Sequence, residues 1–394
     1  MGRFNSTLVQ NERLLPGIHG LRGVAALAVV LFHLVHVGGV SPPNLFAFID
    51  RDFGYGVHLF FILSAFSLMH STELRTNSPH WLVNYFTKRF FRIAPLFYLM
   101  LSLWVAVGVM KGVDVADAAR LLLNMTFTFG FVPPSGIVWG GWSIGVEMMF
   151  YAVFPVLLLL VKTHRAAFLL LITTVVASTA SRTALHAQEL TTGAASQFDW
   201  CYFSFLPNMC FFAMGLYAYV VVKRFKGRAL LRIYVPIFAT LAVGGLLLSD
   251  LGPRLYSSAR PDIVLWGIGL SALCAWQAHQ PSPVIANRVG HYLGERSYSI
   301  YLLHPVVLAL LKGQLLKVYE WTSPVLGSYA FFLCAGLLMV GLLVCVEFTY
   351  RAIELPGIQL GRRWIAARES STIVPPIHLG EHEYRHASQV RICG

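Results

Sequence analysis

Two side chains that could carry out chemistry lie in the first apolar segment of the chain, residues 21–40. Arg22 stands at its start and His33 lies eleven residues later. The segment is about long enough to span a bilayer, and on a helix Arg22 and His33 fall on one face, about 16 Å apart along the axis. An imidazole, with an ordinary pKa of about 6.5, can take a proton from a hydroxyl group or attack a carbonyl carbon. Ionisable residues within a span mark functional sites by default, so we interpret this pair as functional.

A packing explanation exists for each member of the pair taken alone. An arginine at a helix end can extend its side chain to the membrane surface, and a buried histidine can hydrogen-bond to a neighbouring helix. The occurrence of both residues on one face of one helix favours the functional interpretation over two unrelated packing contacts.

Glu147 is the third candidate, in the stretch WGGWSIGVEMMFY of a later apolar segment. A carboxylate near the bilayer midplane costs about 2.5–3.5 kcal/mol on insertion scales unless it is paired or hydrated. We therefore predict that Glu147 is functional, or is the partner of a buried histidine or arginine. Gly141 and Gly145 form a G-x-x-x-G pattern, which predicts close helix packing, and Trp139 is typical of an interfacial aromatic belt.

Arg89 and Arg92 lie three residues apart in the stretch TKRFFRIAPLFY, at the start of the third apolar segment. Residues with this spacing share a helix face. Guanidinium groups present planar sets of donors that match phosphate oxygens, so the pair predicts a phosphate-binding site at the cytoplasmic mouth of this segment. Anchoring to lipid headgroups is the competing explanation and fits the motif at least equally well.

Four further polar residues are weaker candidates. Tyr301 and His304 are three residues apart in the stretch GERSYSIYLLHP and share a helix face. Pro305, which follows, would loosen the helix there. His58 and Ser64 occur in GVHLFFILSAF. A polar packing contact is the alternative for each of them. The chain contains no nucleotide-binding loop, H-E-x-x-H zinc motif or hydrolase nucleophile elbow, and we expect no metal cofactor.

The composition indicates a polytopic membrane protein. Of the 394 residues, 56% are apolar and only 12% are charged, against about 25% charged residues in soluble domains. The formal net charge of +12 could indicate nucleic-acid binding. The basic residues lie in loops between apolar segments, however, which argues against nucleic acid as a partner and for a lipid bilayer.

The predicted fold class is all-α, a polytopic integral membrane protein with about ten transmembrane helices. The domain organisation that follows is a cytoplasmic N-terminus at 1–20, a membrane domain at 21–350, and a cytoplasmic, partly disordered tail at 351–394. One more apolar segment, 121–136, is interrupted by two prolines and predicts a re-entrant or interfacial segment. The predicted spans are 21–40, 53–70, 93–110, 138–161, 166–186, 201–222, 230–249, 262–279, 297–316 and 326–350.

The distribution of basic residues predicts that both termini are cytoplasmic. With ten spans and the N-terminus inside, 22 of the 30 Lys and Arg residues fall on the cytoplasmic side, as the positive-inside rule requires. The polar tail contains His378, His382 and His386, which make a metal site there a weak alternative.

The motifs taken together resemble the acyltransferase-3 family of integral membrane acyltransferases. An arginine, ten residues and a histidine in the first span, then R-x-x-R at the third, form the signature pair of that family. The resemblance covers nearly the whole membrane region, with the landmarks in family order. The matching motifs are LPGIHGLRGVAALAVVLFH at 15–33, GVHLFFILSAF at 56–66, Arg89 with Arg92, Trp142-Ser143 with Glu147, and SYSIYLLHP at 297–305.

The resemblance implies a ten-span acyltransferase of the plasma membrane, or bacterial inner membrane, acting on cell-envelope or secreted glycans. An acyl-coenzyme A, commonly acetyl-coenzyme A, donates from the cytoplasmic side, and the acceptor is a hydroxyl of a glycan or lipid-linked glycan. His33 is similar to the family's catalytic histidine, and Glu147 matches an acidic position that we assign to the catalytic group. The donor-side arginines of the family look like Arg22, Arg89 and Arg92 of this chain.

Two positions depart from the family pattern. The family usually reads Gly-Val-Asp before the phenylalanines of the second span, where this chain has His58 as the third residue. It often reads Leu-Ser-Gly-Phe where this chain has Ala65. The missing aspartate puts in doubt any role of that turn but leaves the pair in the first span unaffected.

A proton-coupled secondary transporter of a small anion is the rival class. Intramembrane histidine and glutamate side chains with broken helices suit such a protein as well. A transporter often has two matching halves, and the second half of this chain contains no second Arg-x10-His or R-x-x-R pattern. We therefore favour the membrane O-acyltransferase.

Overall fold

The computed structural model describes residues 15–73, 80–112, 117–192, 200–249 and 262–372. These residues contain no β-strand, which confirms the predicted all-α class. The elements in chain order are α2 (Pro16–His36), η1 (Asn44–Phe46), α3 (Phe48–Asp52), η2 (Phe53–Tyr55), α4 (Gly56–Glu73), α5 (Trp81–Met110), α6 (Ala118–Met125), η3 (Thr128–Phe131), η4 (Pro133–Ser135), α7 (Trp142–Leu160), α8 (His164–Thr192), α9 (Trp200–Phe203), α10 (Phe205–Arg224), η5 (Leu230–Tyr234), α11 (Val235–Leu248), α12 (Asp262–His279), α13 (Arg288–Glu295), α14 (Ser297–Leu326), η6 (Gly327–Tyr329), α15 (Ala330–Thr349), η7 (Tyr350–Glu354) and α16 (Leu355–Thr372).

The predicted spans all fall on helices, although the helix ends differ from the predicted ones. Among the described residues, eight stretches are long and apolar enough to cross a membrane. The last of these, Ser297–Glu369, contains α14, α15 and most of α16. Helix α12 is apolar over Ile263–His279 and is shorter than the eight.

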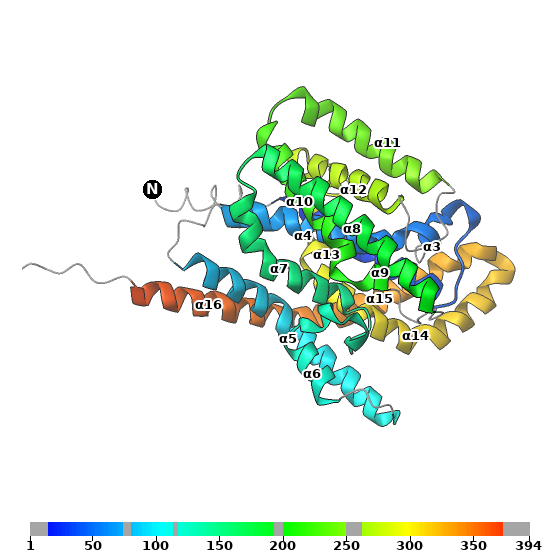
Figure 1. Cartoon of the computed structure of the whole chain (residues 1–394). Coiled ribbons are helices and arrows are strands. Elements are labelled where there is room, and N and C mark those ends of the chain that lie inside the picture. The colour runs from blue at the N-terminus through cyan, green and yellow to red at the C-terminus, as the bar shows by residue number, and fades with distance from the viewer. Residues whose placement is uncertain (1–14, 74–79, 113–116, 193–199, 250–261, 373–394) are drawn as a thin grey trace, which may run out of the picture.

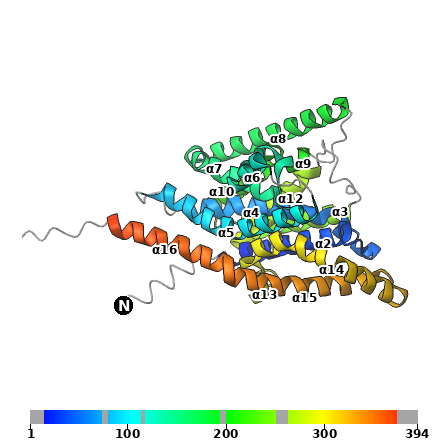
Figure 2. The same cartoon turned by 90° about the horizontal axis from the view of Figure 1, so that it is seen from below.

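Helix α4 forms the centre of the bundle, with 13 of its 18 residues buried. The helices pack in the succession α8, α10, α4, α2, α14 and α15, which Figure 2 shows from one edge to the other. Close packing in this succession needs small residues, because interiors have no spare volume. A Cβ atom at Gly215 of α10, for example, would lie 2.2 Å from the carbonyl oxygen of Ile62 in α4.

The outer helices keep large apolar side chains exposed. Leu241 of α11 is 70% exposed and Phe348 of α15 is 72% exposed. In a soluble protein so much exposed apolar surface would be a liability, whereas in a bilayer it faces lipid chains. The exposed side chains therefore agree with an integral membrane protein.

Segment 121–136, predicted to be re-entrant or interfacial, folds as part of α6 followed by η3 and η4. The Arg120 guanidinium of α6 ties the segment together by donating to the backbone carbonyl oxygens of Ser135, at the end of η4, and of Gly136, at 3.1 and 3.0 Å. The ring of Phe129 in η3 packs directly against Gly145, where a Cβ atom would lie 2.6 Å from the ring. The close packing predicted at that glycine is confirmed.

The described part of the predicted tail, 351–372, is helical. Helix α15 continues through the π-helical turn η7 into α16 as one long rod (Figure 2). Helix α16 packs on α5, and a Cβ atom at Gly361 would lie 2.8 Å from the Phe91 side chain. The tail histidines lie outside the described residues: His378, His382 and His386.

Candidate active site

A basic pocket of about 680 Å³ lies between α5 and α16. The start of α5 and the length of α16 run side by side there, at the left of Figure 1. The side-chain amide of Asn84 in α5 donates to Glu369 Oε1 in α16 at 2.9 Å and ties the two helices together. The basic side chains that line the pocket are Lys88, Arg89, Arg92 and Arg362.

Three arginines at this end of the bundle are poised to bind an anion. Among the described residues, the guanidiniums of Arg22, Arg89 and Arg92 form no hydrogen bond and no salt bridge. The Nε atoms of Arg22 and Arg89 are buried without a partner, and a buried polar group without a partner is costly. A ligand with phosphate oxygens would supply the missing acceptors.

A smaller cavity of about 50 Å³ lies further along α5, where α2, α4, α7 and α14 meet. Arg92 lines both the basic pocket and this inner cavity, so its side chain borders both spaces. Arg22 interacts electrostatically with Arg92 and with Glu147 across it. The polar residues that line the inner cavity are Arg22, Arg92, Ser143, Glu147, Tyr151, Ser297, Tyr298 and Tyr301.

Glu147 is held by two hydroxyl groups. Ser64 Oγ donates to Glu147 Oε1 at 2.5 Å, and the Tyr151 hydroxyl donates to the same oxygen. The sequence predicts a buried histidine or arginine as one possible partner of Glu147. Arg22 interacts with Glu147 through its charge, without a hydrogen bond or salt bridge. These hydroxyls account for a carboxylate within a span and bring Ser64 to the site.

His33 lies three turns further along α2 than Arg22, and its side chain contacts α14. Its Nδ1 atom is 2.9 Å from the Val29 carbonyl oxygen and 3.2 Å from His304 Nε2. The ring of Trp139 meets the His33 ring edge-on, with centroids 5.3 Å apart. Trp139 was predicted as part of an interfacial belt, and its contact with His33 is a feature that the sequence did not indicate.

Tyr301 connects the inner cavity to the histidine pair. Its hydroxyl accepts a hydrogen bond from Ser143 Oγ at 2.7 Å and donates to the Gly140 carbonyl oxygen at 3.0 Å. Its ring lies 5.6 Å from that of His304. The predicted shared face of Tyr301 and His304 therefore turns towards both parts of the site.

Two histidines lie away from this arrangement. His58 is fully buried among aromatic rings, including those of Tyr55 and Phe211, and does not line the inner cavity. His36, one turn beyond His33, points to Asp50, with His36 Nε2 and Asp50 Oδ1 3.3 Å apart. No cluster of three or more His, Cys, Asp or Glu side chains in the described part of the chain could hold a metal ion.

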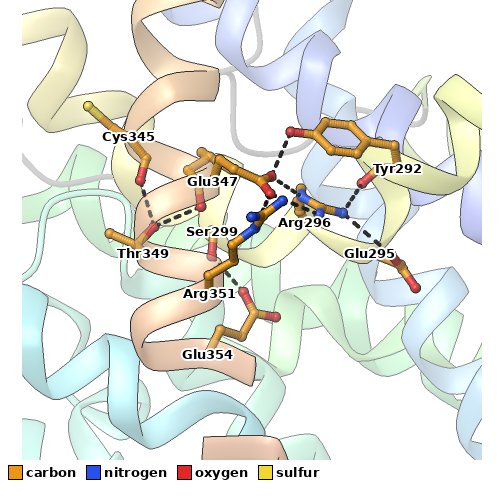
Figure 3. A network of polar contacts seen from close by, with 10 residues as sticks. Tyr292, Glu295, Arg296, Ser299, Cys345, Glu347, Thr349, Arg351 and Glu354 are labelled. Atoms are coloured by element: carbon orange, nitrogen blue, oxygen red, sulfur yellow. Dashed lines mark hydrogen bonds and ion pairs between the residues drawn. The ribbon is translucent and has the colours of Figure 1, made fainter. Parts of the chain in front are cut away.

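Glu354 is a buried carboxylate that the sequence analysis missed. It is 1% exposed, lies in the π-helical turn η7 and accepts a hydrogen bond from Ser299 Oγ at 2.5 Å (Figure 3). The charges of Arg92 and Arg22 act on it. The predicted last span ended at residue 350, which placed Glu354 in the tail and hid its position beside the arginines.

A neighbouring ionic network fixes the turn that leads into α14. Arg296 Nε donates to Glu347 Oε2 of α15 at 2.7 Å (Figure 3). The Arg296 guanidinium also lies between the rings of Tyr292 and Tyr350, 3.9 and 4.4 Å from their centroids. This network joins the end of α13 to α15 and so positions the first residues of α14, which line the inner cavity.

A family model described as an acyltransferase domain matches residues 15–347. The peptidoglycan O-acetyltransferase OatA of Listeria monocytogenes is 24% identical over 384 residues, covering 88% of this chain. The chain spans only 56% of the length of OatA. BcsY of Komagataeibacter xylinus, provisionally described as a membrane-bound transacylase, is 25% identical over 391 residues, 89% of this chain and 85% of BcsY.

The exopolysaccharide production protein ExoZ of Rhizobium meliloti is 32% identical over a shorter stretch of 106 residues, 25% of this chain and 32% of ExoZ. No solved structure matches the chain significantly. The family match extends from before Arg22 to Glu347 and includes all the motifs that form the site. The chain therefore belongs to the acyltransferase-3 family of integral membrane acyltransferases.

Proposed function

We propose that this protein transfers an acyl group from acyl-coenzyme A, commonly acetyl-coenzyme A, to a hydroxyl of a cell-envelope or exported glycan. The observation that carries the proposal is the basic pocket, which shares the lining residue Arg92 with the inner cavity. An anion-binding pocket alone would also suit the rival transporter. Membership of an acyltransferase family favours acyl transfer over transport.

The donor's phosphates fit the basic pocket in charge and in size. Coenzyme A carries a pyrophosphate and a ribose phosphate, and arginine side chains bind phosphate oxygens through two parallel hydrogen bonds. A volume of about 680 Å³ falls in the usual range for small-molecule sites. Arg89 and Arg92 form no salt bridge among the described residues, so the donor has no salt bridge to displace there, although the charge of Glu354 also acts on Arg92.

The acyl group would reach His33 by passing the inner cavity. Arg22 and His33 are on one helix, α2, and eleven residues correspond to about 16 Å along its axis. The pantetheine arm of the donor is a thin chain that would extend from the phosphates past Tyr301 towards the histidine pair. The acceptor glycan would approach from the opposite end of α2, beside the 38% exposed Trp139.

Two reaction routes use His33. In direct transfer the acceptor oxygen attacks the thioester carbonyl carbon while His33 takes the hydroxyl proton, the carbon–sulfur bond breaks, and the proton passes to the departing thiolate. In stepwise transfer the Nε2 atom of His33 attacks the carbonyl carbon first and the carbon–sulfur bond breaks to release the thiolate. The acceptor oxygen then attacks the acyl carbon, the imidazole leaves, and the hydroxyl proton passes to the thiolate. We assign Glu147, which lines the inner cavity, to the catalytic residues together with His33.

The glycan acceptor is supported by the names of the relatives, which refer to peptidoglycan and exopolysaccharide. Both named materials lie outside the cytoplasm, whereas coenzyme A is cytoplasmic. A protein that joins them must span the plasma membrane, or bacterial inner membrane, with the basic pocket inside. With that orientation we infer, as the charge count predicts, that both termini are cytoplasmic.

The decisive test is to delete the gene and compare the ester-linked acyl groups on the cell's glycans by mass spectrometry. We expect one class of glycan to lose its ester groups and to regain them when the wild-type gene is restored. A restored His33→Ala gene should leave the glycan unmodified. An unchanged ester profile across all glycans of the deletion strain would reject the proposal.

A further inference from the structure

The two histidines of the site form a direct pair across the interface of α2 and α14. His304 Nε2 lies 3.2 Å from His33 Nδ1. His304 is 1% exposed, and its other ring nitrogen, Nδ1, lies 2.5 Å from the Tyr301 carbonyl oxygen. His304 thus uses both ring nitrogens within the protein, one on its own helix and one on His33.

The neighbours of the two rings allow only one assignment of protons in the uncharged pair. A carbonyl oxygen can only accept, so His304 Nδ1 carries the proton and His304 Nε2 is an acceptor. His33 Nδ1 faces two acceptors, His304 Nε2 and the Val29 carbonyl oxygen at 2.9 Å, and therefore carries the proton as well. We assign these protons from the hydrogen-bond partners, and they leave the lone pair of His33 on Nε2.

Nε2 of His33 is also the ring nitrogen that a substrate can reach. This atom forms no hydrogen bond with the described residues. It is also absent from the polar atoms of these residues that are buried without a partner, so it is open to solvent or to a ligand. The Nδ1 side of the ring is closed off by Val29 and His304. The reactive lone pair and the accessible nitrogen are therefore the same atom.

Pro305 explains why His304 takes this orientation. In a regular helix the Tyr301 carbonyl oxygen would accept from the backbone N–H of residue 305. Proline has no N–H, so this carbonyl oxygen is free, and His304 Nδ1 donates to it instead. The dipeptide His304-Pro305 thus fixes its own histidine ring and points Nε2 at α2.

We infer that His304 is a positioning residue that holds His33 in the Nδ1-protonated tautomer, so that His33 Nε2 is the atom that reacts. The inference rests on the proposed function and names the atom and its orienting partner. It holds for both reaction routes, because each uses the same lone pair. When Nε2 takes up a proton or an acyl group, the positive ring donates a stronger hydrogen bond to His304.

Two substitutions separate the two contacts of His304. His304→Gln places an amide oxygen near the former Nε2 and can still accept from His33, whereas His304→Asn places its amide near the former Nδ1 and reaches only Tyr301. We expect His304→Asn to lower kcat about 100-fold, the lower end of what a general base contributes. We expect KM for acetyl-coenzyme A to stay within about twofold, and His304→Gln to recover at least a tenth of the wild-type kcat.

Equal activity of the Asn and Gln variants would overturn the inference, and so would a loss of activity that follows the amount of folded protein. The His33→Ala variant, assayed in parallel, distinguishes a failure of the proposed function from a failure of the positioning role of His304. If His33→Ala keeps its turnover, the catalytic role in the proposed function fails. If only His33→Ala is inactive and His304→Asn is as active as wild type, the positioning role alone fails.

A spectroscopic measurement tests the tautomer without relying on activity. Nitrogen NMR of the protein labelled with 15N-histidine distinguishes a protonated ring nitrogen from a bare one, and the His33 signals are those lost in His33→Ala. We expect Nδ1 protonated and Nε2 bare in the wild-type protein, and a smaller excess of this tautomer in His304→Asn, in which the Val29 carbonyl oxygen is the acceptor that remains at Nδ1. A wild-type His33 with its proton on Nε2 would contradict the inference.

Discussion

His33 is the side chain on which the proposed chemistry depends, and its neighbour His36 provides a matched control. The two differ by one turn of α2, but His33 contacts His304 whereas His36 contacts Asp50. We expect His33→Ala to lower kcat by about 10²- to 10⁴-fold, because a general base acts in the transition state. His36→Ala should stay within about threefold. Turnover and donor affinity of both variants, measured on purified protein, check this, and equal losses in the two would point to a structural effect.

Substitution of Glu354 is predicted to strengthen the binding of coenzyme A. Its carboxylate interacts with Arg92 and Arg22 and so competes with a donor phosphate for these positive charges. Glu354→Gln should therefore bind coenzyme A several-fold more tightly and unfold at a lower temperature, because a buried charge cluster loses its counter-ion. Calorimetric binding and thermal unfolding measure the two effects, with the exposed Glu320→Gln as control. Weaker binding would mean that Glu354 supports the donor site.

Helices α5 and α16 together line the basic pocket, which we propose binds the donor. Each charge-assisted hydrogen bond contributes about 1.5–3 kcal/mol, and 1.4 kcal/mol is tenfold in affinity. We expect the double variant Arg89→Ala with Arg92→Ala to weaken coenzyme A binding at least 100-fold while the protein remains inserted. Dephospho-coenzyme A, which has one phosphate fewer, should lose less on the same mutation. Unchanged affinity in the double variant would mean that these arginines do not bind the donor and would favour the competing explanation, anchoring to lipid headgroups.

Two adjacent arginines of α16 test whether this helix forms a wall of the pocket. Arg362 lines the basic pocket, and its neighbour Arg363 does not. We expect Arg362→Ala to weaken coenzyme A binding about three- to tenfold, since this side chain is exposed and its charge is screened, and Arg363→Ala to leave it unchanged. Equal effects of the two variants would indicate a general electrostatic attraction and not a contact in the pocket.

Under the proposed function the whole molecule separates a cytoplasmic donor from an exported acceptor, and this gives a prediction about topology. Reporter tags at the N-terminus and at Phe225–Gly227, after α10, should both report the cytoplasm. A tag between α11 and α12 should report the opposite side, as expected from the positive-inside distribution. If the N-terminal tag and the tag at 225–227 reported opposite faces of the membrane, the ten-span arrangement would be contradicted.

Much of the architecture could be predicted from the sequence, because a bilayer imposes its own rules on composition. A span needs about 20 apolar residues and an internally hydrogen-bonded backbone, so the all-α class and the position of each long apolar helix follow from hydropathy. Helix periodicity likewise places Arg22 and His33 on one face, since both belong to one uninterrupted helix. These predictions depend on local sequence alone.

Contacts between distant segments depended on the tertiary structure. Glu147 meets Ser64, and His33 meets His304 across 271 positions of chain, and no pattern within one helix determines such pairs. Helix α16 was interpreted as tail because its sequence is polar, yet its packing on α5 completes the basic pocket. His58 and Ser64 show the same limit. Both belong to α4, but packing buries one among aromatic rings and places the other on Glu147, because in a central helix the neighbours on each side decide what a polar residue contacts.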